Sequence, residues 1–401
     1  MSLDRKKSTL ALLALAISAF AIGTTEFISV GLLPLISDDL HISVTTAGLT
    51  VTLYALGVTF GAPVLTSLTT AISRKTLLLA LMLLFIAGNS LAAAAGGISM
   101  LLAARILSAL SHGLFMSIAS TIAADLVTED RRASAISMMF TGLTVATVTG
   151  VPLGTFLGQQ LGWRAAFIAI AAVGLIALIA NLLLVPAALR KGTRTPLREQ
   201  VKLVTNGRLL LAFAITALGY GGTFVVFTYL SPLLHEISGF QEQTVAVILL
   251  VYGIAIAIGN VIGGKAANRK PLNALFYMFA FQAAVLLVLT FTAPFKAAAL
   301  ITIFFMGLLA FMNVPGLQVY VVMLADRFAP SARDVASAVN IAAFNAGIAI
   351  GAYLGGLVTD HLGLVHTPWI GSIMVLGAVV LTAWSRALEN RDGRKLQSQA
   401  A

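Results

Sequence analysis

The sequence predicts an all-α membrane protein with twelve transmembrane helices arranged as two pseudo-symmetric six-helix bundles. Three observations lead to this fold class. Hydrophobic residues make up 59% of the 401 residues and charged residues only 10%, whereas a soluble domain carries about 25% charged residues. The apolar residues are gathered into long runs, and nearly all charges lie at or near the ends of those runs.

Each expected helix is an apolar run long enough to span a bilayer, for which a helix needs roughly 20 residues. The first run is longer than the apolar segment of a signal peptide, about 7–15 residues, so we interpret it as a retained span. The twelve runs cover residues 9–35, 44–70, 75–96, 98–126, 133–159, 164–187, 209–234, 243–266, 272–293, 297–324, 335–360 and 367–388.

A polar stretch at 188–208 with six Lys and Arg residues interrupts this series. It predicts an N-terminal bundle at 1–187, a cytoplasmic linker at 188–208 and a C-terminal bundle at 209–401. The halves resemble each other locally, since Gly-Thr-Phe-Leu-Gly at 154–158 is matched by Gly-Ala-Tyr-Leu-Gly at 351–355. Six helices return the chain to its starting side, so the halves are expected to be parallel repeats, as in many secondary transporters.

The distribution of basic residues predicts the orientation. With the N-terminus in the cytoplasm, 22 of the 25 Lys and Arg residues lie on cytoplasmic segments, while Arg164 and Lys296 lie on outer loops and Arg105 lies within a span. This asymmetry follows the positive-inside rule, so both termini are expected to be cytoplasmic. The net charge of +10 is spread over seven segments facing an anionic leaflet, and we expect no nucleic-acid partner.

Glu26 and Arg105 are the one acid and the one base placed deep within apolar runs. Counting about 1.5 Å per residue from the outer ends of their runs places both roughly 10–12 Å below the outer surface. Such residues cost about 2.5–3.5 kcal/mol to insert and are mostly functional. We expect Glu26 to carry a proton and Arg105 to tune it, because burial disfavours a charged carboxylate and a nearby arginine favours it. The alternative is a static ion pair that joins two helices.

His112 follows Arg105 by seven residues and therefore lies on the same helix face, about two turns deeper. One interpretation is a cavity-lining group that binds solute or shares in proton coupling. The other is a histidine hydrogen-bonded to a neighbouring helix. The sequence leaves both open.

The fifth run contains Gly150, Pro152 and Gly154 among further glycines. Small residues at four-residue spacing predict close helix packing, and the proline predicts a kink. These three residues are therefore candidates for a conformational role. A closely packed, kinked helix would suit a protein whose halves rock against each other.

Polar residues within the apolar runs of the second half are candidates for binding a solute. The segment Asn-Val-Pro-Gly at 313–316 should break the tenth helix, which is tolerated only where the freed carbonyls face protein or water. Interhelical hydrogen bonding is the alternative role for each candidate. The candidates are Tyr252, Asn313, Gln318, Asn340 and Asn345.

Several of these segments resemble the major facilitator superfamily, in particular its drug:proton antiporter group of twelve-helix transporters and the branch of arabinose-efflux-like and chloramphenicol-resistance-like permeases. Thr-Glu-Phe at 25–27 resembles the first-helix signature of that group, and Arg-Ile-Leu-Ser-Ala-Leu-Ser-His-Gly at 105–113 resembles the fourth-helix motif. Gly-Val-Pro-Leu-Gly at 150–154 is similar to the antiporter motif. The segments at 314–318 and 340–345 also resemble this branch and add Phe344 to the solute-binding candidates.

The chain departs from the gating motif of that family between the second and third helices. In that family the motif carries Gly, Asp, Arg and Gly ahead of a basic pair, and its repeat copy in the C-terminal half usually carries Asp. These charged residues hold the cytoplasmic side closed. Because several of them are missing here, we expect an inward-open form to be readily populated. The corresponding residues of this chain are Thr66, Thr70, Ala71 and Ser73 ahead of Arg74 and Lys75, with Asn268 and Arg269 in the repeat copy.

The sequence thus predicts a proton-coupled exporter, an antiporter for small neutral or weakly polar molecules such as sugars or drugs, working by alternating access. A neutral substrate is expected because Glu26 is assigned to the proton and the second half offers no deep carboxylate. A proton symporter or facilitator for uptake is the alternative. A membrane-embedded enzyme is a further alternative, although no His-Glu-x-x-His run or paired intramembrane aspartates occur.

The remaining expectations concern surroundings and partners. We expect a multi-pass protein of the bacterial inner membrane, a monomer, whose partners are its small-molecule substrate, protons and membrane lipid. Cysteine is absent from the chain, which excludes disulfides, thiol catalysis and cysteine-based metal sites. No cofactor or metal is expected.

Overall fold

The computed structural model describes residues 5–69, 72–128, 132–187, 203, 205–267, 270–329 and 333–400. Within these ranges the chain is helical almost throughout and forms no strand. Twelve of its helical segments are long and apolar enough to cross a membrane. The predicted all-α membrane fold with twelve spans is therefore confirmed.

The first six spans follow the predicted runs closely, with ends shifted by a few residues. Ser43 and Ser73 act as N-caps, since their hydroxyls accept hydrogen bonds from the backbone N–H groups of Thr46 and Thr76, which satisfies donors that the first helical turn leaves free. The helices are α1 (Arg5–Leu40), α2 (Val44–Leu68), α3 (Arg74–Ala93), α4 (Ile98–Asp125), α5 (Arg132–Val145), the π-helical turn η2 (Ala146–Gly150), α6 (Val151–Leu161) and α7 (Trp163–Leu184).

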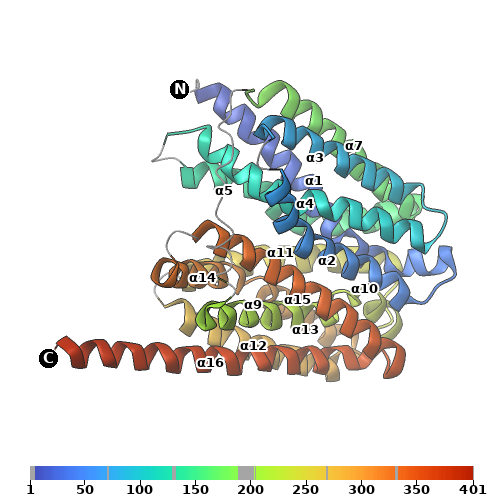
Figure 1. Cartoon of the computed structure of the whole chain (residues 1–401). Helices are drawn as coiled ribbons and strands as arrows, with labels where there is room; N and C mark the ends of the chain where they lie inside the picture. Colours follow the sequence, from blue (N-terminus) through green and yellow to red (C-terminus); the bar gives the residue numbers. More distant parts are fainter. Residues whose placement is uncertain are drawn as a thin grey trace. The chain divides into compact units, whose positions relative to one another are not determined.

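The last six spans contain two long helices that are broken into shorter pieces. In Figure 1 the terminal helix α16 extends beyond its neighbours as a long straight rod. The helices are α9 (Gly207–Phe227), α10 (Leu230–Pro232), η3 (Leu233–Ile237), α11 (Glu242–Ala267), α12 (Pro271–Thr292), α13 (Lys296–Ala310), α14 (Val314–Phe328), α15 (Arg333–His361), η5 (Leu364–His366) and α16 (Thr367–Ala400).

The predicted break of the tenth helix is confirmed, and the fifth span, for which a kink was predicted, contains a π-helical turn. In the fifth span the helix widens into η2 just before Pro152. Proline lacks the N–H that would continue the ordinary hydrogen-bond ladder, and a π-helical turn is one way to absorb that defect. In the tenth span α13 ends at Ala310 and α14 begins at Val314, with Pro315 in its first turn.

By their internal contacts, the helices form two compact units. The first comprises Met1–Arg194 with Thr228–Gly253, and the second comprises Thr195–Phe227 with Ile254–Ala401. The predicted linker lies almost wholly outside the described residues. The division into two six-helix halves at 188–208 therefore stays a prediction.

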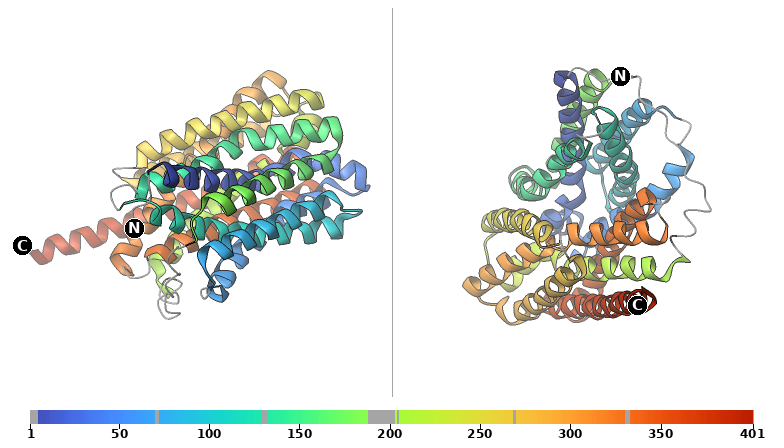
Figure 2. Two further views of the ribbon diagram at one scale, coloured as in Figure 1. Left: turned by 90° about the horizontal axis from the view of Figure 1, so that it is seen from above. Right: turned by 90° about the vertical axis from the view of Figure 1, so that its left-hand side faces the viewer.

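Each unit is built around one central helix. In the first unit α1 packs against α2, α4, α5, α6 and α7, and in the second unit α9 packs against α14, α15 and α16. Figures 1 and 2 show α9, α15 and α16 running side by side in the second unit. The central position of α1 brings Glu26 into contact range of several other helices.

Candidate functional site

Arg105 lies in the interior of α4 and is only 1% exposed. Its guanidinium donates hydrogen bonds to three backbone carbonyls on two other helices. Nη1 donates to Thr25 O of α1 (2.7 Å), Nη2 to Glu26 O of α1 (3.2 Å), and Nε to Thr50 O of α2 (3.2 Å). The planar fork of guanidinium donors suits this arrangement, and it ties α1, α2 and α4 together inside the first unit.

Glu26 is a direct neighbour of Arg105 through its backbone and not through its carboxyl group. Among the described residues, no hydrogen bond joins the Glu26 carboxyl to another group, and no ion pair within 4.0 Å joins it to Arg105. The guanidinium is still close enough to act electrostatically on it. The structure therefore brings the two predicted residues together without the direct ion pair of the static alternative, and leaves both carboxyl oxygens available.

Tyr54 of α2 links Arg105 to His112. The Arg105 Cζ atom lies 4.1 Å from the centroid of the Tyr54 ring, a cation–π distance. The Tyr54 hydroxyl lies 3.2 Å from His112 Nδ1, and both side chains are buried. His112 thus makes a contact with a neighbouring helix, as the second interpretation predicts. A role of His112 in proton coupling stays a prediction.

Thr25 and Asn89 extend this polar cluster to α3. The Thr25 hydroxyl donates to Asn89 Oδ1 (3.1 Å), and the Asn89 amide donates to Phe85 O (2.9 Å). The residues on either side of Glu26 in the sequence are Thr25 and Phe27, and all three are buried. The backbone around Glu26 is therefore held by α3 and α4 while its carboxyl group is not.

The glycines of the fifth span press against α1. A Cβ atom on Gly150 would lie 2.7 Å from the Thr24 hydroxyl oxygen, and one on Gly154 would overlap the Ile28 side chain. Gly142 faces the backbone of Ala16 and Gly158 faces Leu32 in the same way. Real Cβ atoms essentially never approach another atom more closely than 3.0 Å, so a larger residue at any of these positions requires α1 or one of its side chains to shift. The obstacle is backbone at Gly142 and a side chain at the other three. Close packing of this span is confirmed, and its partner is the helix that carries Glu26.

Most of the predicted solute-binding residues gather in the second unit, where two short chains of hydrogen bonds cross it. In one chain the Asn313 amide donates to Gln282 Oε1 (3.1 Å), and the Gln282 amide contacts the Thr223 hydroxyl. In the other, the Asn340 amide donates to Gln318 Oε1 (2.8 Å) and Asn340 Oδ1 accepts from Thr216 (2.8 Å).

The second chain ends where Gln318 contacts Ser337. Gln318 and Asn340 thus have partners on neighbouring helices, as interhelical hydrogen bonding predicts.

Asn345 and Phe344 of α15 lie in a different setting from Asn340. The Asn345 amide donates to Ile341 O of its own helix (3.0 Å), while its Oδ1 atom is buried without a hydrogen-bond partner. Asn313 Oδ1 is likewise buried and without a partner. The Phe344 ring lies 4.9 Å from that of Tyr220, which also contacts Phe311. Aromatic side chains and a few polar groups are the usual lining of a small-molecule site, and the second unit contains both.

Tyr252 is the exception among the predicted solute-binding residues. It is buried in α11 within the first unit, while the other candidates lie in the second. Its part in solute binding stays a prediction.

The sequence comparison decides the family. The sequence pattern of the Major Facilitator Superfamily matches residues 15–323, which is more than half of the chain and includes Glu26, Arg105 and His112. The chain belongs to the major facilitator superfamily. It is a membrane transporter with the fold of that superfamily, as the resemblance of its motifs predicts.

Relatives of similar length agree with this assignment. The chain is 74% identical over 392 residues to the MFS-type transporter YtbD of Bacillus subtilis (strain 168), covering 98% of this chain and 99% of the relative. It is 37% identical over 375 residues to the inner membrane transport protein YdhP of Escherichia coli (strain K12), covering 93% and 95%.

A solved structure shares the fold at much lower sequence identity. The crystal structure of a bacterial homolog of the human lysosomal transporter Spinster matches with a TM-score of 0.69 and 15% identity, covering 96% of each chain.

The remaining gating residues of this major facilitator protein are engaged within the first unit. Arg74 at the start of α3 forms an ion pair with Asp125 at the end of α4, and Lys75 Nζ donates to Leu182 O of α7 (2.8 Å). Asn268 and Arg269 lie outside the described residues. A readily populated inward-open form of the transporter stays a prediction.

Sequence reasoning missed three residues that the structure places in these clusters. Tyr54, Tyr220 and Gln282 are polar residues within long apolar runs, the same signal that identified Asn313 and Asn340. Tyr54 is the most informative of them, because it bridges Arg105 and His112. A tyrosine is easily taken for an interfacial anchor, and only the packing of α2 on α4 reveals its buried hydroxyl contact.

Proposed function

We propose that this transporter is a proton-coupled secondary active exporter of small neutral or weakly polar molecules, such as sugars or drugs. Protons would enter as substrate leaves, by alternating access. We further propose that it resides in the bacterial inner membrane as a monomer with both termini in the cytoplasm.

The observation that carries the proposal is the setting of the Glu26 carboxyl. It is buried in a spanning helix beside a guanidinium whose hydrogen bonds go to backbone carbonyls. A carboxyl group without a fixed side-chain partner can gain and lose a proton without breaking a hydrogen bond. A shift of α1 relative to α4 would change its distance from the Arg105 charge and hence its protonation. The glycine contacts of the fifth span give α1 a close neighbour through which such a shift could be transmitted.

A neutral substrate is supported by the second unit. Among the described residues, the buried polar side chains of the second unit are amides and hydroxyls, and they include the unpaired Oδ1 atoms of Asn313 and Asn345. A permanent cation would need a compensating anion, because an unpaired charge in low dielectric is strongly unfavourable. Hydroxylated or amide-bearing molecules can donate to these acceptors.

The test measures the direction of two fluxes in proteoliposomes that contain the purified transporter. A panel of neutral sugars, nucleosides, chloramphenicol and a quaternary ammonium compound is screened under an imposed pH gradient. Export by antiport predicts opposite proton and substrate fluxes for a neutral member of the panel. Parallel fluxes would establish the uptake symporter instead, and substrate flux without proton movement would establish a facilitator.

Glu26→Gln is the decisive variant in this assay. It is expected to abolish gradient-driven transport while the protein folds and inserts, because an amide cannot carry the proton. Glu236→Gln is the matched control, since Glu236 is exposed beyond the end of a spanning helix, and it should transport like the wild type. Gradient-driven transport at the wild-type rate in Glu26→Gln would exclude Glu26 as the proton carrier.

A further inference from the structure

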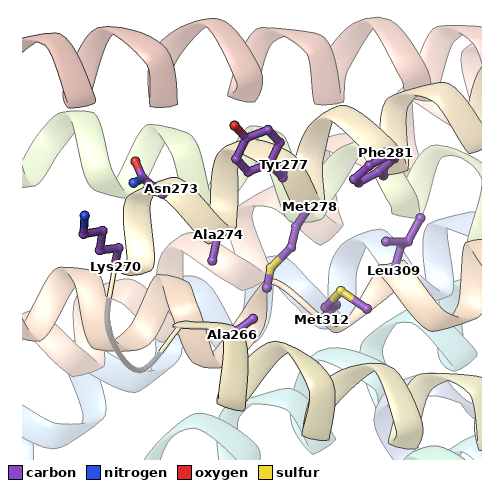
Figure 3. Close-up of a pocket in the computed structure, with 9 residues that line it drawn as sticks. All are labelled: Ala266, Lys270, Asn273, Ala274, Tyr277, Met278, Phe281, Leu309 and Met312. Atoms are coloured by element: carbon purple, nitrogen blue, oxygen red, sulfur yellow. The ribbon is translucent and has the colours of Figure 1, made fainter.

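A groove of about 510 Å³ runs along α12 in the second unit, between this helix and parts of α11 and α13 (Figure 3). Lys270 and Asn273 lie at one end of it, and Phe281 and Leu309 lie at the other. The middle is lined by apolar side chains, among them Met278 and Met312. The groove therefore has one cationic, polar end and a long apolar remainder.

The length of the groove matches one leaflet of a membrane. Lys270 and Phe281 are eleven residues apart, which corresponds to about 16 Å along a helix at about 1.5 Å per residue. That is roughly half of the ~30 Å hydrocarbon thickness of a bilayer. An acyl chain anchored at the Lys270 end would therefore run along the groove within a single leaflet.

The surroundings of the groove are those of a lipid-facing surface. Tyr277 and Phe281, which line it, are 57% and 63% exposed. Large aromatic side chains with this exposure on a spanning helix face hydrocarbon. Lys270 immediately precedes the span Pro271–Thr292, so its ammonium lies at the level of the lipid headgroups. The positive-inside count places this end at the cytoplasmic leaflet.

The polar end of the groove is suited to a phosphate. Lys270 is exposed and, within the described part of the chain, no ion pair or side-chain hydrogen bond engages it. Asn273 adds an amide donor, and the start of α12 adds the positive end of a helix dipole. A free phosphate ion would use only this end and leave the apolar groove empty. A molecule that joins a phosphate to acyl chains uses both.

We propose that this groove binds an anionic phospholipid of the surrounding membrane, with the headgroup phosphate at Lys270 and Asn273 and an acyl chain along Tyr277, Met278 and Phe281. Basic residues near a membrane surface attract anionic lipids. The apolar lining adds affinity through buried methylene groups. Nothing in the proton-coupling site is required for this binding.

The first experiment measures lipid retention by native mass spectrometry of delipidated full-length transporter mixed with phosphatidylglycerol or phosphatidylcholine. Wild type is expected to retain phosphatidylglycerol preferentially. Lys270→Ala should lower that retention about fivefold, which corresponds to about 1 kcal/mol for one lysine near an anionic surface. Lys265→Ala is the matched control, because Lys265 is an exposed lysine five residues away that does not line the groove.

The second experiment blocks the apolar part and keeps the charge. Ala274→Phe places a large side chain in the groove and should also lower retention, whereas Ala284→Phe makes the same change at an exposed position of α12 outside it. Ala274→Leu replaces Ala274→Phe if the larger residue prevents folding.

Three outcomes would overturn the proposal. The first is equal loss of retention in Lys270→Ala and Lys265→Ala, and the second is unchanged retention when the groove is filled. The third is protection of the protein against thermal unfolding by inorganic phosphate as strong as that by phosphatidylglycerol.

Discussion

At the scale of single residues, the polar centre of the first unit depends on how Arg105 uses its donors. A guanidinium that binds carbonyl oxygens of Thr25, Glu26 and Thr50 fixes the backbones of two helices. It does so without neutralising the Glu26 carboxyl by direct contact. The arginine thus serves two purposes, since it holds three helices together and supplies a fixed positive charge near a titratable group.

Arg105→Ala is expected to be more damaging than Arg105→Lys. Alanine leaves three buried carbonyls without their charged donors, and hydrogen bonds to charged groups contribute about 1.5–3 kcal/mol each. Lysine keeps the charge but cannot reach all three carbonyls with one ammonium group. We expect alanine to lower stability by at least about 3 kcal/mol, lysine by less, and both to change the pH profile of transport. Thermal unfolding and pH-dependent flux measure this, and wild-type pH profiles in both variants would show that Arg105 and Glu26 are uncoupled.

Asn340 and Asn345 allow solute binding to be separated from helix packing. Asn340 is hydrogen-bonded to side chains of two other helices, whereas the Asn345 acceptor has no partner. Asn340→Ala should therefore lower the unfolding temperature. Asn345→Ala should leave it nearly unchanged and weaken substrate binding up to about tenfold, the effect of one hydrogen bond. If Asn345→Ala binds substrate like the wild type and Asn340→Ala does not, the roles assigned to the two residues are wrong.

At the scale of helices, the fifth span shows how small residues determine packing. Its α5, η2 and α6 segments lie against α1 through four glycines, and an added Cβ atom at each would lie within 3.0 Å of an atom of α1. The π-helical turn ends at Gly150, two residues before Pro152. The irregularity therefore lies where this span contacts Thr24, two residues from Glu26.

Gly142→Ala is expected to destabilise the transporter by about 1–3 kcal/mol, the usual effect of overpacking. The added methyl group would overlap the Ala16 carbonyl oxygen, which is backbone and cannot rotate away. Gly96→Ala is the matched control, because nothing lies within 4 Å of a Cβ there. Thermal unfolding of both variants in detergent measures the difference. Equal stability of the two variants would mean that α5 can move away from α1 without cost.

At the scale of the whole molecule, the twelve spans and the basic residues at their ends define a topology that cysteine labelling can test. The chain has no native cysteine, so single cysteines report unambiguously. Gly96→Cys lies between α3 and α4, at the predicted outer end of the third span, and Thr128→Cys lies in a predicted cytoplasmic loop; both positions are exposed. In intact cells a membrane-impermeant maleimide should label only Gly96→Cys, and after lysis it should label both. Labelling of Thr128→Cys alone in intact cells would reverse the orientation.

The class of this protein follows from its amino acids alone. Twelve apolar runs of membrane-spanning length can only be satisfied as helices in a bilayer, because backbone groups find no other partners there. The break at 311–313, just before Pro315, and the π-helical turn just before Pro152 follow from the same local rule, since proline removes a donor wherever it stands. Glu26 and Arg105 stood out because charge within an apolar run is costly.

Tertiary structure alone decided which atoms of these residues meet. Equal depth along two helices places Glu26 and Arg105 near each other, but helix rotation and packing decide whether carboxyl or carbonyl oxygens face the guanidinium. The contact of Tyr54 depends on α4 as much as on its own helix, and the partners of Asn340 lie on α9 and α14. Hydrogen bonds between helices far apart in sequence follow from close packing, and that packing is a property of all the side chains together.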